Sequence, residues 1–260
     1  MDRISVVQGL IDTLQAKTYV EIGVSWGHAF LSIRAPRKFA VDPFNRTPRH
    51  LFSRHSEWPL RWKALVGRWL KRLGREDSRF FEMTSDDFFR RVPHIFSEHK
   101  IDVAFIDGLH TYEQAYRDVE NCLRFLAPGG VIVMHDCNPA DAAIAVPATS
   151  VEDAASKKIP GWKGMWCGDV WKAIVDLRRR PDLKVFVLDT DFGVGVVTRG
   201  IPDKALSYSK EDVARMSYEK DLAQERTSLL NLKDPSYFHE FARGLSSAAK
   251  EPVAAAEVGV

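Results

Sequence analysis

Acidic and imidazole side chains follow two short apolar runs of this sequence. Asp107 and His110 follow the run VAFI, and His135 and Asp136 follow the run VIVM. Apolar runs of this length are typical of buried strands, so the four polar side chains stand where two strands end. Carboxylates bind divalent cations and imidazoles move protons. We therefore expect a chemical site at these strand ends.

Each of the four side chains has a candidate role. Asp107 and Asp136 are placed to share a hard divalent cation, Mg²⁺ or Mn²⁺, through their oxygens. His110 is the candidate general base because an imidazole with a pKa near ~6.5 accepts a proton at neutral pH; alternatively it caps the next helix or bonds local backbone. His135 is a third candidate metal ligand, or else a second base or a group that orients Asp136.

A glycine-containing turn follows an apolar run near the start of the sequence, TYVEI. In EIGVSWG, Glu21 precedes Gly23, Ser25 and Gly27, which differs from the GxGxxG turn that approaches a pyrophosphate in dinucleotide-binding proteins. S-adenosylmethionine has no phosphate and carries an ammonium and a sulfonium group, which an acid beside the turn suits. Asp42, about 20 residues on, stands where an acid typically holds ribose hydroxyls. The alternative is a turn that needs glycine only for its geometry.

The segment TSDDFF begins a further helix. Ser85 or Asp86 is expected to cap it, and both are assigned to the cofactor site, with Asp86 near the adenine edge. Asp107 is assigned to the cofactor as well as to the metal. Polar residues would therefore converge from five strand ends.

Strands and helices alternate along the chain around these positions. Helical apolar spacing occurs in residues 4–16, in residues 112–126 and in DVWKAIVDLRRR, and the strand-like runs are TYVEI, KFAV, RFFEM, VAFI, VIVM, DLKVFVL and GVGVVT. This alternation predicts an α/β fold with a Rossmann-like, doubly wound, mostly parallel seven-stranded sheet and an antiparallel last strand. Ligands of such sheets bind outside the carboxyl ends of the strands.

Five segments in succession carry a family resemblance. EIGVSWG, AVDP, TSDDFF, FIDGLHTYEQ and LAPGGVIVMHDCNP resemble the successive motifs of class I S-adenosylmethionine-dependent methyltransferases, over Tyr19 to Thr198. The pairing of IDGxHxYE with PGGxIxxHD is similar to the sugar and small-molecule O-methyltransferases, among them the macrocin-type and methylmannose-polysaccharide enzymes. The resemblance implies a saccharide or other small-molecule acceptor, a base in the loop of His110, and in many relatives a divalent metal. Those relatives have two carboxylates where this chain has His135 and Asp136.

The composition is ordinary for an enzyme of 260 residues. Lys and Arg number 37 against 35 Asp and Glu, a formal charge of +2 that argues against a chain that coats nucleic acid. The sequence has no apolar run of the ~18 residues that suggest a membrane span, and its first residues lack a signal-peptide pattern. A cytoplasmic location is expected. The three cysteines have no metal-ligand spacing and are expected to be free thiols.

The expected organisation is a methyltransferase domain over residues 1–200, a helical extension over 201–247 and a disordered tail over 248–260. Residues 44–78 form a basic, tryptophan-rich insertion, expected to act as a lid or a homodimer contact, with a solvated helix or a membrane-surface helix as alternatives. The C-terminal helices are the alternative homodimer contact. Trp166 is expected to line a pocket and Trp171 to pack in the core. Two other functions stay open, a nicotinamide-dependent oxidoreductase and a non-catalytic cofactor-binding module.

Overall fold

The computed structural model describes residues 1–44 and 77–248. Its centre is an eight-stranded sheet with the order β3-β2-β1-β4-β5-β7-β6-β8. The strands are β1 (Thr18–Ile22), β2 (Arg37–Val41), β3 (Asp77–Phe81), β4 (Ile101–Ile106), β5 (Leu126–Met134), β6 (Leu183–Leu188), β7 (Val194–Arg199) and β8 (Leu232–Lys233). The predicted architecture is confirmed, because β7 alone runs antiparallel to its neighbours β5 and β6.

The short strand β8 is an addition to the seven predicted strands. It pairs in parallel with the end of β6 and has two residues. Two residues are too few to show an alternating pattern of apolar and polar side chains, so the sequence carried no signal for it.

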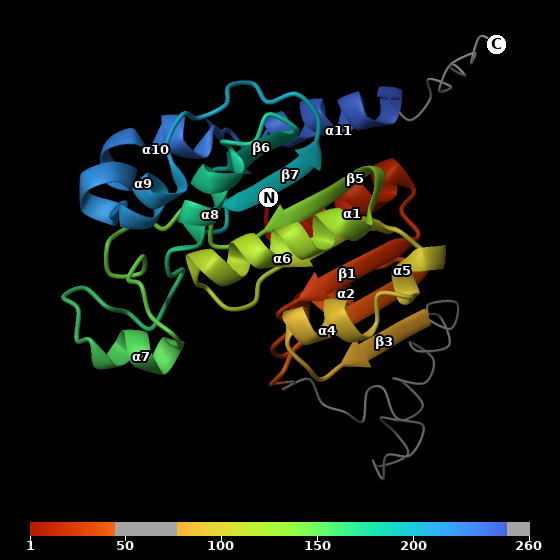
Figure 1. The fold of residues 1–260 in the computed structure, drawn as a ribbon, viewed down its shortest axis with the longest axis horizontal. Coiled ribbons are helices and arrows are strands. Elements are labelled where there is room, and N and C mark those ends of the chain that lie inside the picture. Colours follow the sequence, from red (N-terminus) through yellow and green to blue (C-terminus); the bar gives the residue numbers. More distant parts are fainter. Residues whose placement is uncertain (45–76, 249–260) are drawn as a thin grey trace.

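Helices cover both faces of the sheet (Figure 1). One face packs against α4 (Ser85–Arg91), α5 (Ile95–Glu98), α6 (Tyr112–Phe125), α8 (Val170–Leu177), α9 (Lys210–Arg215), a π-helix (Tyr218–Leu222) and α10 (Ala223–Leu230). The opposite face packs against α1 (Arg3–Leu14), α2 (His28–Ser32) and α11 (Tyr237–Ala248). Helix α7 (Val151–Ser156) lies away from the sheet, in a small apolar cluster with Trp166.

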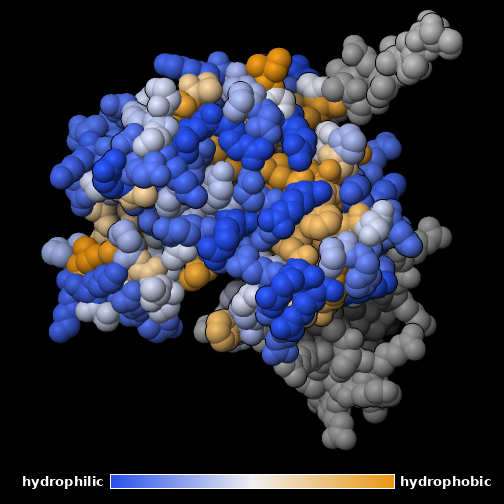
Figure 2. All heavy atoms as spheres, in the orientation of Figure 1, coloured by the Kyte–Doolittle hydropathy of each residue, from blue (hydrophilic) through white to orange (hydrophobic). Residues whose placement is uncertain are grey.

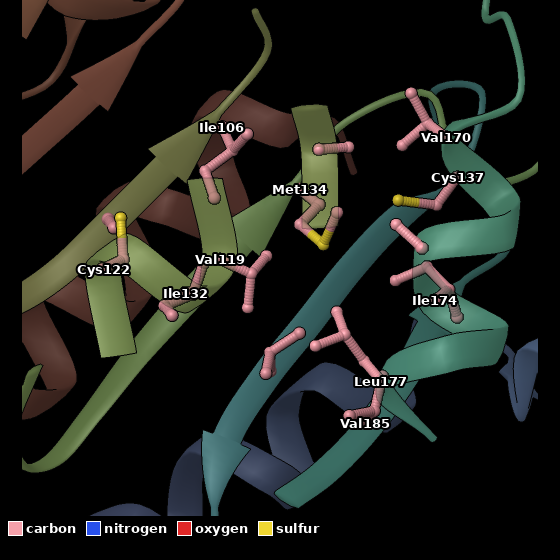
Figure 3. Packing of buried hydrophobic residues seen from close by; sticks show 14 of the residues in the cluster. Ile106, Val119, Cys122, Ile132, Met134, Cys137, Val170, Ile174, Leu177 and Val185 are labelled. Atoms are coloured by element: carbon pink, nitrogen blue, oxygen red, sulfur yellow. The ribbon is translucent and has the colours of Figure 1, made fainter. Parts of the chain in front are cut away.

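The core results from the alternation of side chains along each strand. In β4, Ala104 and Ile106 pack toward α6 and α8, while Val103 and Phe105 pack toward α1 and α11. Figure 3 shows the first of these layers, in which aliphatic side chains of α6, α8 and the sheet interdigitate. The outer surface over these helices is mostly hydrophilic (Figure 2). All three cysteines are buried free thiols, as predicted.

The register of the parallel strands brings their carboxyl ends together. Ile22 at the end of β1 is opposite both Val41 of β2 and Ile106 of β4, and Ile106 is opposite Met134 of β5. Backbone hydrogen bonds continue one residue beyond the strands, from Asp107 N to Ile22 O and from His135 N to Ile106 O, at 2.8 and 3.0 Å. The polar residues that follow each strand are therefore neighbours.

Two predicted segments lie mostly outside the described residues. They are the insertion at 44–78 and the tail at 248–260, of which residues 45–76 and 249–260 are not described. The extension at 201–247 contributes α9, the π-helix, α10, β8 and most of α11. No helix of the described chain is both long and apolar enough to cross a membrane.

Candidate active site

Two carboxylates and two imidazoles meet at the ends of β4 and β5. His110 Nε2 lies 3.4 Å from Asp107 Oδ1, and His110 Nδ1 lies 3.3 Å from Asp136 Oδ2. His135 Nδ1 lies 3.3 Å from Asp107 Oδ1 and 3.2 Å from Asp136 Oδ2. The four residues predicted from the two strand ends are thus brought together, and each carboxylate contacts both histidines.

Mutual attraction sets the charges of this cluster. Burial opposes ionisation of Asp107, but its contacts with His110 and His135 hold the pKa of its carboxyl well below the usual value. Burial would likewise lower the pKa of the two imidazoles, yet the neighbouring carboxylates raise the pKa of His110 to about 9 and that of His135 to about 12. Without a further cation, the cluster stabilises both histidines as cations.

The donor set suits a divalent cation. Ligand atoms of Asp107, His110 and Asp136 all lie within 4.8 Å of one another. His135 Nδ1 is buried between the same two carboxylates and, within the described chain, has no partner in hydrogen-bond geometry. Carboxylate oxygens with an imidazole nitrogen are ligands for Mn²⁺ and related ions, and carboxylates alone suit Mg²⁺. The residues present therefore fit a metal ion.

A loop from α7 to α8 holds His110 in place. Trp166 O accepts a hydrogen bond from His110 Nδ1 at 2.7 Å, and the Trp166 ring lies 5.3 Å from the imidazole. Gly168 packs so closely on His110 that an added Cβ would lie 1.9 Å from His110 O. Asp169 caps α6 by accepting from Tyr112 N, so His110 is not the cap of that helix.

Two residues of the site had not been predicted. Arg3, at the start of α1, donates from Nη1 to both oxygens of Asp191 at 3.0 Å and lies 3.1 Å from His135 Nε2. Asp191 lies in the tight turn between β6 and β7, a position for which the sequence predicted no function. Arg3 stands in no motif, and only the packing of α1 beside the strand ends reveals it.

The glycine turn after β1 is shaped by contact with the β4 end. Gly23 has a φ of +83°, and a Cβ there would lie 2.0 Å from Asp107 O. Asp42 Oδ2 accepts hydrogen bonds from Val24 N and Ser25 N at 2.8 and 2.7 Å. Only glycine fits this close approach, and Asp42 fixes the turn in addition to any role toward a ligand.

Glu21 lies beneath this turn and is almost completely buried. Its side chain accepts a hydrogen bond from the Tyr19 hydroxyl at 2.5 Å. Burial raises the pKa of the Glu21 carboxyl to about 8, and the Tyr19 hydrogen bond only partly offsets this effect. Glu21 is therefore mostly neutral at pH 7 when nothing else is bound.

Two cavities share the glycine turn as a common wall. One, of about 380 Å³, is lined by Asp42, Ser85, Gln114 and Asp118; we call it the β2-side cavity. The other, of about 390 Å³, is lined by residues that include Glu21, the metal-site residues Asp107 and His110, and Trp26 and Trp166; we call it the β5-side cavity. Gly23, Ser25, Asp107 and Gly108 line both.

The remaining predicted residues lie partly in the cavity walls and partly elsewhere. Thr84, not Ser85 or Asp86, caps α4, because its side chain accepts from Asp87 N. Ser85 Oγ therefore faces inward and donates to Asp118 at 2.5 Å. Asp86 points toward Arg117 and Asn121 of α6 and is not in the cavity wall. Gly27 begins α2, Trp166 lines the β5-side cavity as expected, and Trp171 packs in the core.

Part of this chain matches a known protein family. Residues 20–137 match a family model described as a methyltransferase domain. No curated protein matches. Similar solved structures include the methyltransferase PaMTH1 of Podospora anserina with S-adenosylhomocysteine bound, at 15% identity over 77% of this chain and 80% of that one, with a TM-score of 0.46.

Two further structures are O-methyltransferases by name. That of Bacillus cereus, in complex with S-adenosylhomocysteine, is 15% identical over 75% of this chain and 78% of that one, with a TM-score of 0.44. TomG of Streptomyces achromogenes, in complex with S-adenosylmethionine, is 14% identical over 76% and 79%, with a TM-score of 0.45.

Proposed function

We propose that this chain is an S-adenosylmethionine-dependent methyltransferase that transfers the methyl group to a hydroxyl oxygen of a small molecule, a saccharide or another polyol-like acceptor. The observation that carries the proposal is that the β5-side cavity brings the candidate base His110 and the metal-site residue Asp107 next to Glu21 and the glycine turn. Methyl transfer to oxygen needs an acceptor aligned with the methyl carbon and a group that removes the acceptor proton. The cavity would hold the acceptor, and His110 in its wall would remove the proton.

The two cavities would divide the cofactor between them. Asp42 and Ser85 line the β2-side cavity, which suits the ribose and the adenine, while Glu21 lies in the wall of the β5-side cavity, where a carboxylate suits the ammonium group. When bound, the cofactor supplies an electrophilic methyl group. The assignment of Asp86 to the cofactor rests on the sequence alone. Its side chain is turned toward α6.

His110 would take the proton of the acceptor hydroxyl at Nε2. The carbonyl of Trp166 can only accept a hydrogen bond, so His110 Nδ1 carries a proton and the Nε2 lone pair is the one available as a base. The two carboxylates that raise its pKa work against this role at neutral pH. A divalent cation between them would offset their charge and return His110 to the neutral form.

Asp107, His135 and Asp136 would hold that cation, Mg²⁺ or Mn²⁺. His135 Nδ1 faces the two carboxylates that contact His110 from the other side, so His135 can serve as a ligand while His110 remains a base. The cation would lower the pKa of an acceptor hydroxyl, which a sugar requires because its hydroxyls are weak acids. Homodimerisation, a cytoplasmic location and a lid at residues 44–78 stay predictions from the sequence.

A calorimetric titration with S-adenosylhomocysteine tests the cofactor assignment. We expect saturable binding of this compound and none of NAD, which is the ligand of the alternative oxidoreductase. Tight NAD binding would overturn the proposal. Methyl transfer to a panel of sugar and phenolic hydroxyls, with Mn²⁺ present or chelated, then separates an enzyme from a non-catalytic binding module.

A further inference from the structure

Glu21 is an acid buried in the wall of the cavity that the cofactor would occupy. Only 1% of the residue is exposed, and its carboxyl accepts hydrogen bonds from the Tyr19 hydroxyl, at 2.5 Å, and from the backbone of Phe30. Tyr19 is itself fully buried, two residues earlier on β1, which places both side chains on the same face of the strand. Glu21 and Tyr19 thus form a buried acid–phenol pair beneath the glycine turn.

Two cations near Glu21, Lys38 and Arg3, donate hydrogen bonds to other groups. Lys38 Nζ on β2 donates to Phe30 O and Ile33 O at 2.8 and 2.7 Å, and its charge lowers the pKa of Glu21 by less than burial raises it. Arg3 and His28 line the same cavity, and Arg3 is paired with Asp191.

The negative charge of Asp107 also opposes ionisation of Glu21. Burial favours the acid form of a carboxyl, and here it raises the pKa of Glu21 to about 8. An ammonium group that entered the cavity would reverse this preference, because an opposite charge in contact favours the ionised form.

We propose that Glu21 is neutral in the empty site and releases its proton to solvent when the ammonium group of the cofactor binds, with the Tyr19 hydroxyl stabilising the carboxylate that forms. This inference rests on the proposed function, since it assigns the ammonium group to Glu21. Cofactor capture is then coupled to the release of one proton. Tyr19 is a positioning residue that touches Glu21 and not the ligand.

The sign of the coupling follows from the proton count. Because bound Glu21 lacks a proton that free Glu21 carries, affinity rises with pH as long as free Glu21 is mainly protonated. The rise approaches tenfold per pH unit between pH 6 and 7 and ends near pH 8. Removing the Tyr19 hydroxyl raises the free energy of the ionised form of Glu21. Tyr19→Phe therefore weakens binding at pH 7 by about tenfold, which corresponds to the loss of one hydrogen bond to a charged group.

Calorimetry measures the proton directly. S-adenosylhomocysteine, which keeps the amino group and lacks the sulfonium charge, is titrated into the full chain at pH 7 in phosphate and in Tris. The difference in heat between buffers of unlike ionisation enthalpy gives the number of protons released. We expect close to one proton for the natural chain and none for Glu21→Gln, whose side chain has the same shape without the titration.

Matched variants separate this effect from a general loss of structure. Tyr112→Phe also removes a buried tyrosine hydroxyl bonded to a carboxylate, that of Asp176 at 2.6 Å, but outside both cavities. It should bind the ligand with natural affinity and natural proton release. His28→Gln should also retain the proton release, which shows that this imidazole is not its source.

The outcomes distinguish the two hypotheses. If S-adenosylhomocysteine does not bind, the proposed function fails. If it binds with heats that do not depend on buffer, or if Glu21→Gln releases the same proton, the coupling is refuted while the cofactor assignment stands. Should Tyr19→Phe fail to fold, the natural chain and Glu21→Gln still decide whether Glu21 is the proton source.

Discussion

Replacing Gly168 with alanine tests whether the site depends on the placement of His110. Gly168 has a φ of +60°, and an added Cβ would lie 1.9 Å from His110 O, whereas real Cβ contacts stay beyond 3.0 Å. The backbone of His110 must therefore move by about 1 Å. A displacement of this size at a reacting group costs roughly 100-fold in rate.

We expect Gly168→Ala to lower kcat by about two orders of magnitude and to change the Kd of S-adenosylhomocysteine by less than about twofold, because Gly168 lines neither cavity. A left-handed alanine also costs about 1–2 kcal/mol of stability. The assays are steady-state methyl transfer, calorimetric binding and urea unfolding.

Gly164→Ala is the matched control for the backbone penalty. Gly164 has a φ of +83°, and a Cβ there meets nothing within 4 Å. It should lose the same ~1–2 kcal/mol of stability and keep natural turnover. If Gly168→Ala is as active as Gly164→Ala, the position of His110 does not matter for the reaction and the assignment of the base is wrong.

Three further outcomes are expected. His110→Ala should reduce turnover by about 10²- to 10⁴-fold, the range for loss of a general base, and leave the calorimetric Kd of S-adenosylhomocysteine unchanged; natural turnover would remove His110 from the mechanism. Asp107→Asn and Asp136→Asn should each weaken Mn²⁺ binding measured by electron paramagnetic resonance at least about tenfold, because each replaces a charged oxygen ligand, and unchanged binding would place the metal elsewhere. Burial raises the pKa of Asp118 to about 6, above its unfolded value, so its contribution to stability is complete below pH 4 and is lost as the pH rises through 6; Asp118→Asn should remove that loss from urea unfolding curves measured between pH 4 and 7.

The sequence predicted the parts of the site that follow strand ends. Asp42, Asp107 and His135 lie where apolar runs stop, and parallel register then makes them neighbours without further information. Asp86 shows the limit of this reasoning. Ser85 and Asp86 are consecutive in α4, where each residue turns the side chain by about 100°, so only one of them can face the cavity. The cap at Thr84 decided which one.

Residues that reach the site through tertiary packing gave no such signal. Arg3 and Asp191 are 188 positions apart, and they meet because α1 covers the sheet beside the β6–β7 turn. Trp166 was expected in a pocket for its aromatic ring, yet its backbone carbonyl is the group that fixes the proton of His110. A backbone contact of this kind depends on the path of a loop and not on residue type.

The convergence of His135 and Asp136 depends on a backbone conformation that the sequence did not indicate. Consecutive residues of a strand point to opposite faces. His135 Nδ1 nevertheless contacts Asp136 Oδ2 as well as Asp107 Oδ1, so both side chains belong to one cluster. Asp136 has a φ of +59°, in the left-handed region, which ends the alternation directly after β5. Such a conformation costs about 1–3 kcal/mol in a residue other than glycine. Since Asp136 also contacts His110 and accepts from Cys167 Sγ at 3.1 Å, interactions from two other segments, the loop after β4 and the loop before α8, hold the turn that completes the site.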